Sequence, residues 1–324
     1  MRVDVHHHVL PPFYMEAIRS AGYDRTGGIH FPQWGPEDSL EVMDRHGIDT
    51  AVLSVSTPGV AFLGDPAAAR RLARRCNEWL AELVAAHPGR FAGLACLPLP
   101  DVDAALAETA HALDVLGLDG VTLLSSAGGR YPGDSVFEPL MEELDRRRAP
   151  VFLHPTTPAG APPPGLDIPV FAVEFVADTT RAIANLILSG TLERHPAITF
   201  ICAHAGGFAP YITTRLEAAW RRSAGAGERA PAGPVAYLRR LHYDTAASAN
   251  PYTLPALLAL AGEDRVLFGT DFPFASEREL AAAFDLLTGA SALTQPLLPA
   301  VAGENARRLL GEIGLKARRS RKHR

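Results

Sequence analysis

The chain has 324 residues, of which 47% are hydrophobic and 21% are charged, and its formal net charge is −5. This length suits one large α/β barrel or two average domains, and the hydrophobic fraction is sufficient for a sizeable core. The acidic balance, the lack of a run of about 18 apolar residues and the lack of a charged leader before an apolar stretch lead us to expect no nucleic-acid partner, membrane span or signal peptide.

Eight short apolar runs, bounded by turn residues, predict β-strands along the chain. They are residues 2–6, 50–56, 91–98, 120–125, 150–154, 199–204, 241–246 and 265–271. Most of these runs are apolar at nearly every position, which is typical of parallel strands that are buried on both faces.

Helical patterns fill the gaps between the runs. In residues 66–86, apolar side chains recur at helical spacing, with arginines on the opposite side. Residues 102–117, 136–147 and 176–196 follow the same pattern. Three cysteines, Cys76, Cys96 and Cys202, lie in apolar segments without metal-type spacing. We expect them to be reduced core residues of a cytoplasmic protein.

The alternation of eight strands with helices, without a break in composition, predicts a single (β/α)8 barrel, an α/β fold of the TIM-barrel type. We expect residues 1–312 to form the barrel and the basic residues 313–324 to form a frayed tail. An open doubly wound sheet is the alternative. That fold would need a glycine-rich phosphate loop after an early strand, and the chain has none.

Two segments rich in Gly and Pro, residues 22–38 and 155–169, predict loops. Both follow the carboxyl ends of predicted strands. Barrel enzymes keep their active sites at this end, so we expect both segments to border a pocket.

Polar side chains that could bind a cation end four of the predicted strands. They are His6 and His8 on the first strand, His154 on the fifth, His204 on the sixth and Asp271 on the eighth. Alternate residues of a strand face the same way, so His6 and His8 share one face while His7 points to the other. A lone histidine is usually structural, but this placement is difficult to attribute to chance.

Neutral imidazoles and a carboxylate that converge on one point suit a divalent cation such as zinc. The predicted ligands are His6, His8, His154 and Asp271. His204 would lie just outside this set, as an acid or base. Asp4 would lie one layer deeper on the same face and orient a ligand. Residues 120–125 offer no Lys, Glu or Cys to bridge a second metal, so we predict one ion.

The segments VDVHHHVLPP, VFLHPTTP, FICAHAGG, VLFGTDFPF and ENARRLL, in this order, resemble the amidohydrolase superfamily. They are most similar to its aminocarboxymuconate-semialdehyde decarboxylase-like branch. Within that branch, PQWGPEDSLEVMDRHGIDTAVLSVSTPGV resembles the 6-methylsalicylate decarboxylases. The resemblance implies one divalent metal, usually zinc and sometimes manganese, in a barrel that releases carbon dioxide without an organic cofactor. It also implies a homodimer or a larger homo-oligomer, and it matches the same four ligands and the same catalytic His204.

The resulting hypothesis is a metal-dependent carboxy-lyase that acts on an ortho-hydroxy aromatic acid such as 6-methylsalicylate. Asp271 or His204 would deliver a proton to the ring carbon that bears the carboxylate. The nearest alternative is a metal-dependent hydrolase of a lactone or amide in the same fold. A catalytically silent barrel is a third possibility, which the intact ligand set disfavours.

Three aromatic residues are candidates for packing the substrate ring, namely Phe31, Trp34 and Phe274. Packing within a loop or against the barrel wall explains each of them equally well. Arg181 and Arg215 could meet a carboxylate. Both lie within helical patterns, where an ordinary surface salt bridge is the better expectation.

Overall fold

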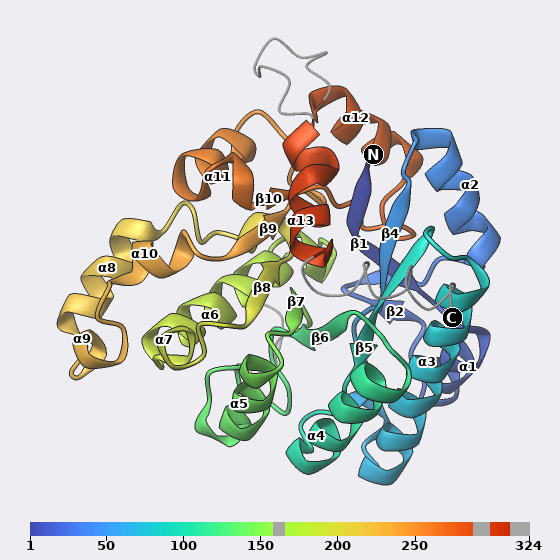
Figure 1. The fold of residues 1–324 in the computed structure, drawn as a ribbon, viewed down its shortest axis with the longest axis horizontal. Helices are drawn as coiled ribbons and strands as arrows, with labels where there is room; N and C mark the ends of the chain where they lie inside the picture. The colour runs from blue at the N-terminus through green and yellow to red at the C-terminus, as the bar shows by residue number, and fades with distance from the viewer. Residues whose placement is uncertain (158–165, 288–298, 312–324) are drawn as a thin grey trace, which may run out of the picture.

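The computed structural model describes residues 1–157, 166–287 and 299–311. Its centre is an eight-stranded sheet with the order β1–β4–β5–β6–β7–β8–β9–β10, in which neighbouring strands of this order pair in parallel (Figure 1). The strands are β1 (Val3–Val9), β4 (Thr50–Val55), β5 (Phe91–Cys96), β6 (Gly120–Leu124), β7 (Pro150–His154), β8 (Thr199–Cys202), β9 (His242–Asp244) and β10 (Val266–Leu267). A separate antiparallel hairpin joins β2 (Arg25–Thr26) to β3 (Ile29–His30).

Backbone hydrogen bonds between β1 and the segment after β10 close the sheet into a barrel. The amide of Asp271 donates to the carbonyl of His6 at 2.8 Å, and the amide of His8 donates to the carbonyl of Phe272 at 2.7 Å. Closure of the barrel therefore brings Asp271 beside His6 and His8 of β1. The predicted (β/α)8 barrel is confirmed.

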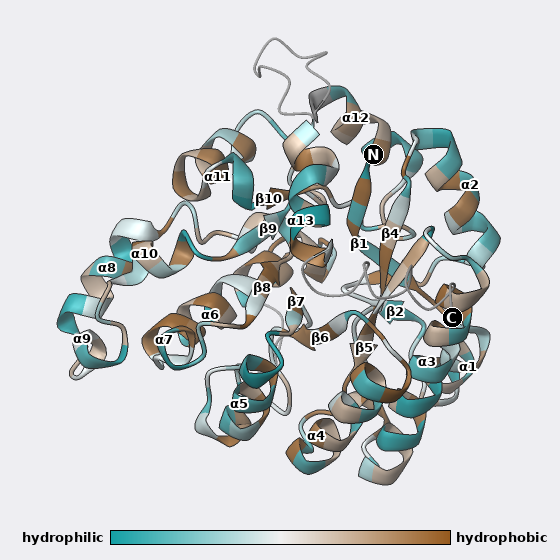
Figure 2. Ribbon diagram, viewed as in Figure 1, coloured by the Kyte–Doolittle hydropathy of each residue, from teal (hydrophilic) through white to brown (hydrophobic). Residues whose placement is uncertain are grey.

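Helices surround the barrel and carry both apolar and polar residues, drawn brown and teal in Figure 2. They are α1 (Pro12–Ser20), α2 (Pro36–His46), α3 (Pro66–Ala86), α4 (Val102–Ala110), α5 (Glu138–Arg146), α6 (Glu174–Leu188), α7 (Thr191–Arg194), α8 (Thr213–Arg222), α9 (Ala226–Arg229), α10 (Pro234–Leu238), α11 (Thr253–Ala261), α12 (Glu277–Leu287) and α13 (Asn305–Gly311). Within the parts of the chain that the structure describes, none of them is long and apolar enough to cross a bilayer.

Helix α3 shows how the sequence builds this outer layer. Asp65 caps its first turn, where the carboxylate accepts from the amides of Ala67 and Ala68 at 3.0 and 3.2 Å. Its buried face includes Leu72, Cys76, Leu80 and Leu83, as the spacing predicts. All three cysteines of the chain are free and buried, and burial raises the pKa of Cys96 to about 12. The expectation of reduced core thiols is confirmed.

The interior of the barrel is apolar at the amino ends of the strands. The cluster there consists of Val3, Val5, Val52, Ala92, Leu94, Phe152, Ile201, Ala203, Leu267, Ala306, Leu309 and Leu310. The last three belong to α13, which contacts β1 and β10 and so covers this end of the barrel. A filled interior of this kind makes the barrel a packed core rather than a pore.

Several boundaries differ from the sequence prediction. The strand that ends at His154 has the predicted bounds, whereas β9 and β10 are shorter because only residues 266–267 pair with 243–244. Residues 22–38, predicted as a loop, contain the β2–β3 hairpin and the start of α2, and α1 was not predicted. The predicted tail at 313–324 and residues 158–165 of the second predicted loop lie outside the described residues.

Candidate functional site

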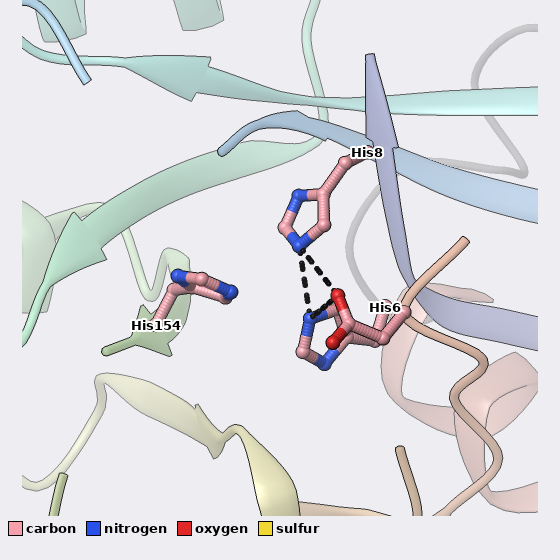
Figure 3. Close-up of side chains that lie close together, drawn as sticks. His6, His8 and His154 are labelled. Carbon is pink, nitrogen blue, oxygen red and sulfur yellow. Dashed lines mark hydrogen bonds and ion pairs between the residues drawn. The ribbon is translucent and has the colours of Figure 1, made fainter. Parts of the chain in front are cut away.

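Four potential metal ligands meet at the end of the barrel where the strands have their carboxyl termini. His6 and His8 project from β1, His154 ends β7, and Asp271 follows β10 (Figure 3). One ligand atom from each of these four side chains lies within 4.8 Å of the other three. A single cation can therefore contact all of them, which is the cluster that the strand ends predict.

The distances between the ligand atoms are those expected of groups that bind one cation. His6 Nε2 lies 3.0 Å from His8 Nε2, and each of these atoms lies 3.2 Å from Asp271 Oδ1 (Figure 3). The rings of His6, His8 and His154 are all buried. Nitrogens bound to one zinc ion at about 2.0 Å must lie close to each other in the same way.

Hydrogen bonds to the opposite nitrogens fix how these rings point. Nδ1 of His6 lies 2.7 Å from Asp244 Oδ2, and Nδ1 of His154 lies 2.7 Å from the carbonyl oxygen of Pro155. Both partners accept, so both Nδ1 atoms donate, and each ring in its neutral form offers the lone pair of Nε2 for a ligand bond. The residues therefore fit a divalent cation, because imidazole nitrogens and a carboxylate oxygen that lie within 4.8 Å of one another suit a positive charge between them.

The pKa values of the cluster reflect its burial and the opposite charges within it. Burial lowers the pKa of His6, but the carboxylates of Asp244 and Asp271 outweigh it and raise the pKa to about 10. Burial and the neighbouring histidines hold the pKa of His154 well below its usual value, so this ring is neutral. Burial raises the pKa of Asp271, but His6 and His204 outweigh burial and hold it well below the usual range.

Local backbone geometry turns two of the site residues inward. His204 and Asp271 have positive φ angles of 53° and 64°, which are uncommon for residues other than glycine and strained by roughly 1–3 kcal/mol each. Gly269 lets the chain pass close to β1, because a Cβ at this position would lie 2.9 Å from the Cβ of His6. Strain of this kind at residues that form a site is typical of functional geometry, although Arg148, outside the site, also has a positive φ.

His204 stands at the edge of the cluster, where the sequence predicts it. Its Nε2 lies 3.3 Å from Asp271 Oδ2, the oxygen of that carboxylate that faces away from His6 and His8. Its Nδ1 is buried and has no hydrogen-bond partner among the described residues. His204 is therefore placed to exchange a proton with Asp271 or with a molecule in the adjoining cavity.

Asp244, at the end of β9, is a site residue that the sequence analysis missed. One carboxylate oxygen holds the ring of His6, and the other accepts from the amides of His204 at 2.9 Å and Ala246 at 3.0 Å. The residue is fully buried. The signal was present, because Asp244 lies near the end of a predicted strand as His154 and Asp271 do.

The structure corrects the expected orientation of Asp4. A register shift between Asp4 and His7 in the β1–β4 pairing interrupts strict alternation and puts these two residues on one side of the strand. Asp4 Oδ2 lies 2.9 Å from His7 Nδ1 and accepts from Thr270 Oγ1 at 2.6 Å, while Asp4 Oδ1 accepts from the backbone amide of His6 at 3.1 Å. Asp4 therefore supports the ligand His6 through the backbone of that residue and not through its ring. The expectation that His7 turns away from His6 and His8 holds, since its Nε2 lies 2.8 Å from Ser39 Oγ.

A cavity of about 460 Å³ adjoins the cluster and is lined by His154, His204 and Asp271 among others. Phe274 also lines it, and Phe31 packs edge-on against Phe274 with ring centroids 6.5 Å apart. Trp34 is not part of the described lining.

Trp34, Arg181 and Arg215, which were also candidates for contact with the substrate, do not line this cavity. The indole of Trp34 donates to Ser39 Oγ at 2.9 Å, and its ring packs against Trp79. Arg181 lies 3.7 Å from Asp178 and 3.8 Å from Glu174, which confirms the expected salt bridge. Arg215 is an exposed residue of α8 that does not line the cavity.

Comparisons with known proteins agree with this architecture. The family model described as "Amidohydrolase" matches residues 3–311. The chain is 36% identical to "Decarboxylase yanB" of Aspergillus niger over 98% of this chain and 89% of that protein. It is also 36% identical to a 6-methylsalicylic acid decarboxylase of Penicillium expansum, over 84% of this chain and 85% of that protein.

A solved structure shares the fold. The dihydroxybenzoic acid decarboxylase of Polaromonas sp. JS666, with bound manganese and the inhibitor 2-nitroresorcinol, is 26% identical. It superposes with a TM-score of 0.74 over 96% of both chains. Together with the match over nearly the whole length, this means that the chain belongs to the amidohydrolase family.

Proposed function

We propose that the protein is a metal-dependent, non-oxidative decarboxylase of an ortho-hydroxy aromatic acid such as 6-methylsalicylate. The observation that carries the proposal is the four-ligand cluster beside an apolar cavity of about 460 Å³. The relatives named above, which act on 6-methylsalicylic acid or bind a nitroresorcinol, support an aromatic substrate.

The lining of the cavity suits a ring that carries a single acidic group. Phe171, Phe175, Val176 and Phe274 offer apolar surface to an aromatic ring. None of the described lining residues is Lys or Arg. The carboxylate of a substrate therefore has to be neutralised at the cation site and by the imidazoles, which places it next to His204.

We propose zinc as the resident ion, with manganese as the alternative. Three imidazole nitrogens and one carboxylate oxygen are a normal zinc ligand set, whereas the Polaromonas relative carries manganese. When bound, the cation supplies a fixed positive charge beside the carboxylate and phenolic oxygens of the acid. The expected homodimer or larger oligomer stays a prediction, which light scattering of the purified protein measures.

His204 is the proposed proton carrier. Its ring lines the cavity, and Asp271 Oδ2 holds its Nε2. In the reaction, the ring carbon that bears the carboxylate takes a proton from His204. The bond from that carbon to the carboxylate then breaks, and its electron pair restores the aromatic ring as carbon dioxide leaves. His204 regains a proton from water, so the step needs no oxidant.

The test is a substrate panel with a matched variant. Metal-loaded enzyme should convert ortho-hydroxybenzoates into phenols with release of carbon dioxide. His204→Gln should keep one metal ion per chain and lose about 10²- to 10⁴-fold in turnover. Release of acid from a lactone, with no carbon dioxide from any hydroxybenzoate, would assign the site to a hydrolase. Loss of the metal from His204→Gln would make His204 a ligand instead of a proton carrier.

A further inference from the structure

A second cavity, of about 560 Å³, opens beside the first, where β4, β5 and β6 end. Val55, Cys96 and Leu124 line it from these three strands, and Phe62 and Leu99 line it from the loops. Arg25 is the one charged side chain in its described lining, and that residue is exposed. The cavity therefore suits a neutral, apolar group.

The two cavities share part of their walls. Thr26 and Thr57 line both of them. The hydroxyl of Thr26 donates to the carbonyl of Thr57 at 3.1 Å, and the hydroxyls of Thr57 and Thr156 lie 2.8 Å apart. Thr156 follows the ligand His154 by two residues and lines the second cavity. Small side chains thus form the boundary, one of them close in sequence to the metal cluster.

Glycine keeps this boundary thin. Gly27 lines the second cavity with a φ of +56°, and a Cβ there would lie 2.8 Å from Cζ of Phe175, which lines the first cavity. Gly59 lies in the lining of the second cavity itself, where a Cβ would lie 3.2 Å from Cδ1 of Leu124. A larger residue at Gly27 would press on Phe175 in the shared wall, and one at Gly59 would narrow the second cavity.

We propose that the second cavity binds an unbranched apolar substituent of the aromatic acid, so that the enzyme accepts alkyl chains of several carbons. The identity of the ring rests on the proposed function. The cation cluster and the first cavity hold the carboxylate and the ring, and the chain passes Thr57 into the second cavity. Each methylene that leaves water raises affinity by roughly threefold to fourfold, so a pentyl group should bind at least tenfold more tightly than a methyl group.

The experiment measures binding, so that it does not depend on turnover. Calorimetry with metal-loaded protein compares 6-methylsalicylate with 6-pentylsalicylate. The variant Leu124→Trp fills the second cavity without altering the described lining of the first. Leu106→Trp, at a half-buried position of α4 that lines neither cavity, is the matched control. If Leu124→Trp does not fold, Leu124→Ala serves instead and should favour chains longer than pentyl.

The wild type and Leu106→Trp should bind the pentyl acid at least tenfold more tightly than the methyl acid. Leu124→Trp should abolish this gain in affinity. Equal affinity for the two acids in the wild type, or a gain that persists in Leu124→Trp, would overturn the proposal, and so would a lack of binding by both acids. Carbon dioxide release is recorded in parallel. Binding that becomes tighter with the length of the alkyl chain, without release of carbon dioxide, would contradict the proposed reaction. It would still support the binding of an alkyl chain in the second cavity.

Discussion

The two ends of the barrel interior have opposite character, although the same strands build both. Towards the amino ends, Val52, Leu94 and Leu267 pack into a dry cluster that α13 covers. Towards the carboxyl ends, His8 and His154 occupy the interior instead. The position of a residue along its strand therefore decides whether it contributes to stability or to chemistry.

The border between the two ends crosses individual strands, as β7 shows. On β7, Phe152 belongs to the apolar cluster, while His154, two residues later, belongs to the metal cluster. The ring of Phe152 meets the ring of His6 edge-on, with centroids 4.8 Å apart. The apolar end thus forms the floor of the site and keeps water away from the imidazoles. We expect damage at the polar end to abolish function with little loss of stability, and damage at the apolar end to do the reverse.

The largest expected effect is at the polar end. His8→Ala removes one of four ligands, so we expect purified protein without metal and a loss of turnover of at least about 10³-fold. Elemental analysis and carbon dioxide release measure both. The matched control is His7→Ala, because His7 is equally buried but bonds Asp4 and Ser39. That variant should keep its metal and lose about 1–3 kcal/mol of stability. Equal metal loss in the two variants would contradict the assignment of the faces of β1.

At the apolar end, Leu94→Ala should act on stability alone. Leu94 is 1% exposed and lies in the cluster inside the barrel. Truncation leaves a cavity, so we expect a loss of about 2–5 kcal/mol in the free energy of unfolding. Urea denaturation measures this loss, and elemental analysis should still find one metal ion per chain. Metal loss in folded Leu94→Ala would show that the two ends are not separable.

Asp244→Asn should have a smaller effect at the polar end, because it alters the support of a ligand and not the ligand itself. The amide keeps the shape of the carboxylate but removes the charge that holds Nδ1 of His6. Loss of such a partner costs roughly 10- to 100-fold in metal affinity, which competition with a chelator measures. Asp244→Glu offers a charge-preserving comparison. Unchanged metal affinity in Asp244→Asn would mean that Asp244 serves only to accept hydrogen bonds from the amides of His204 and Ala246.

The metal cluster could be predicted from sequence because its ligands lie at the ends of strands that the sequence itself identifies. Parallel strands in a closed barrel bring their carboxyl ends to one rim, so His154 and Asp271 had to approach the histidines of β1. Asp244 obeys the same rule, since it lies near the end of the predicted strand 241–246, and the sequence analysis overlooked it. The position of Trp34 was beyond such a rule, since its contact with Ser39 depends on how α2 packs.

The side on which Asp4 lies could not be predicted. Strict alternation puts Asp4 with His6, but a register shift in β1 reverses this. The shift accompanies hydrogen bonds from the amide and hydroxyl of Thr270 to the carboxylate of Asp4, across 266 positions of sequence. A bulge that depends on so distant a partner leaves no periodic trace in the segment that contains it.

The smallest expected effect is on the outer surface, where neither end of the barrel is disturbed. Glu143 on α5 accepts hydrogen bonds from Arg146 and from Arg147, and Arg147 also donates to Asp114. The hydrogen bond from Arg146 is the largest cause that lowers the pKa of Glu143 to about 2, with Arg147 adding to it against the effect of burial. Because the pKa is depressed in the folded state, the stabilisation is fully present above about pH 4.5 and is lost as the pH falls towards 2.

Glu143→Gln should therefore lower the free energy of unfolding at pH 7 by about 1 kcal/mol or less, since solvent screens pairs this close to the surface. The difference between variant and wild type should shrink as the pH falls from about 4.5 towards 2, because protonation of Glu143 in the wild type removes the same charge. Urea denaturation across this range measures the difference, with metal content and turnover at pH 7 as controls that should not change. A difference that is independent of pH would mean that Glu143 contributes through packing and not through its charge.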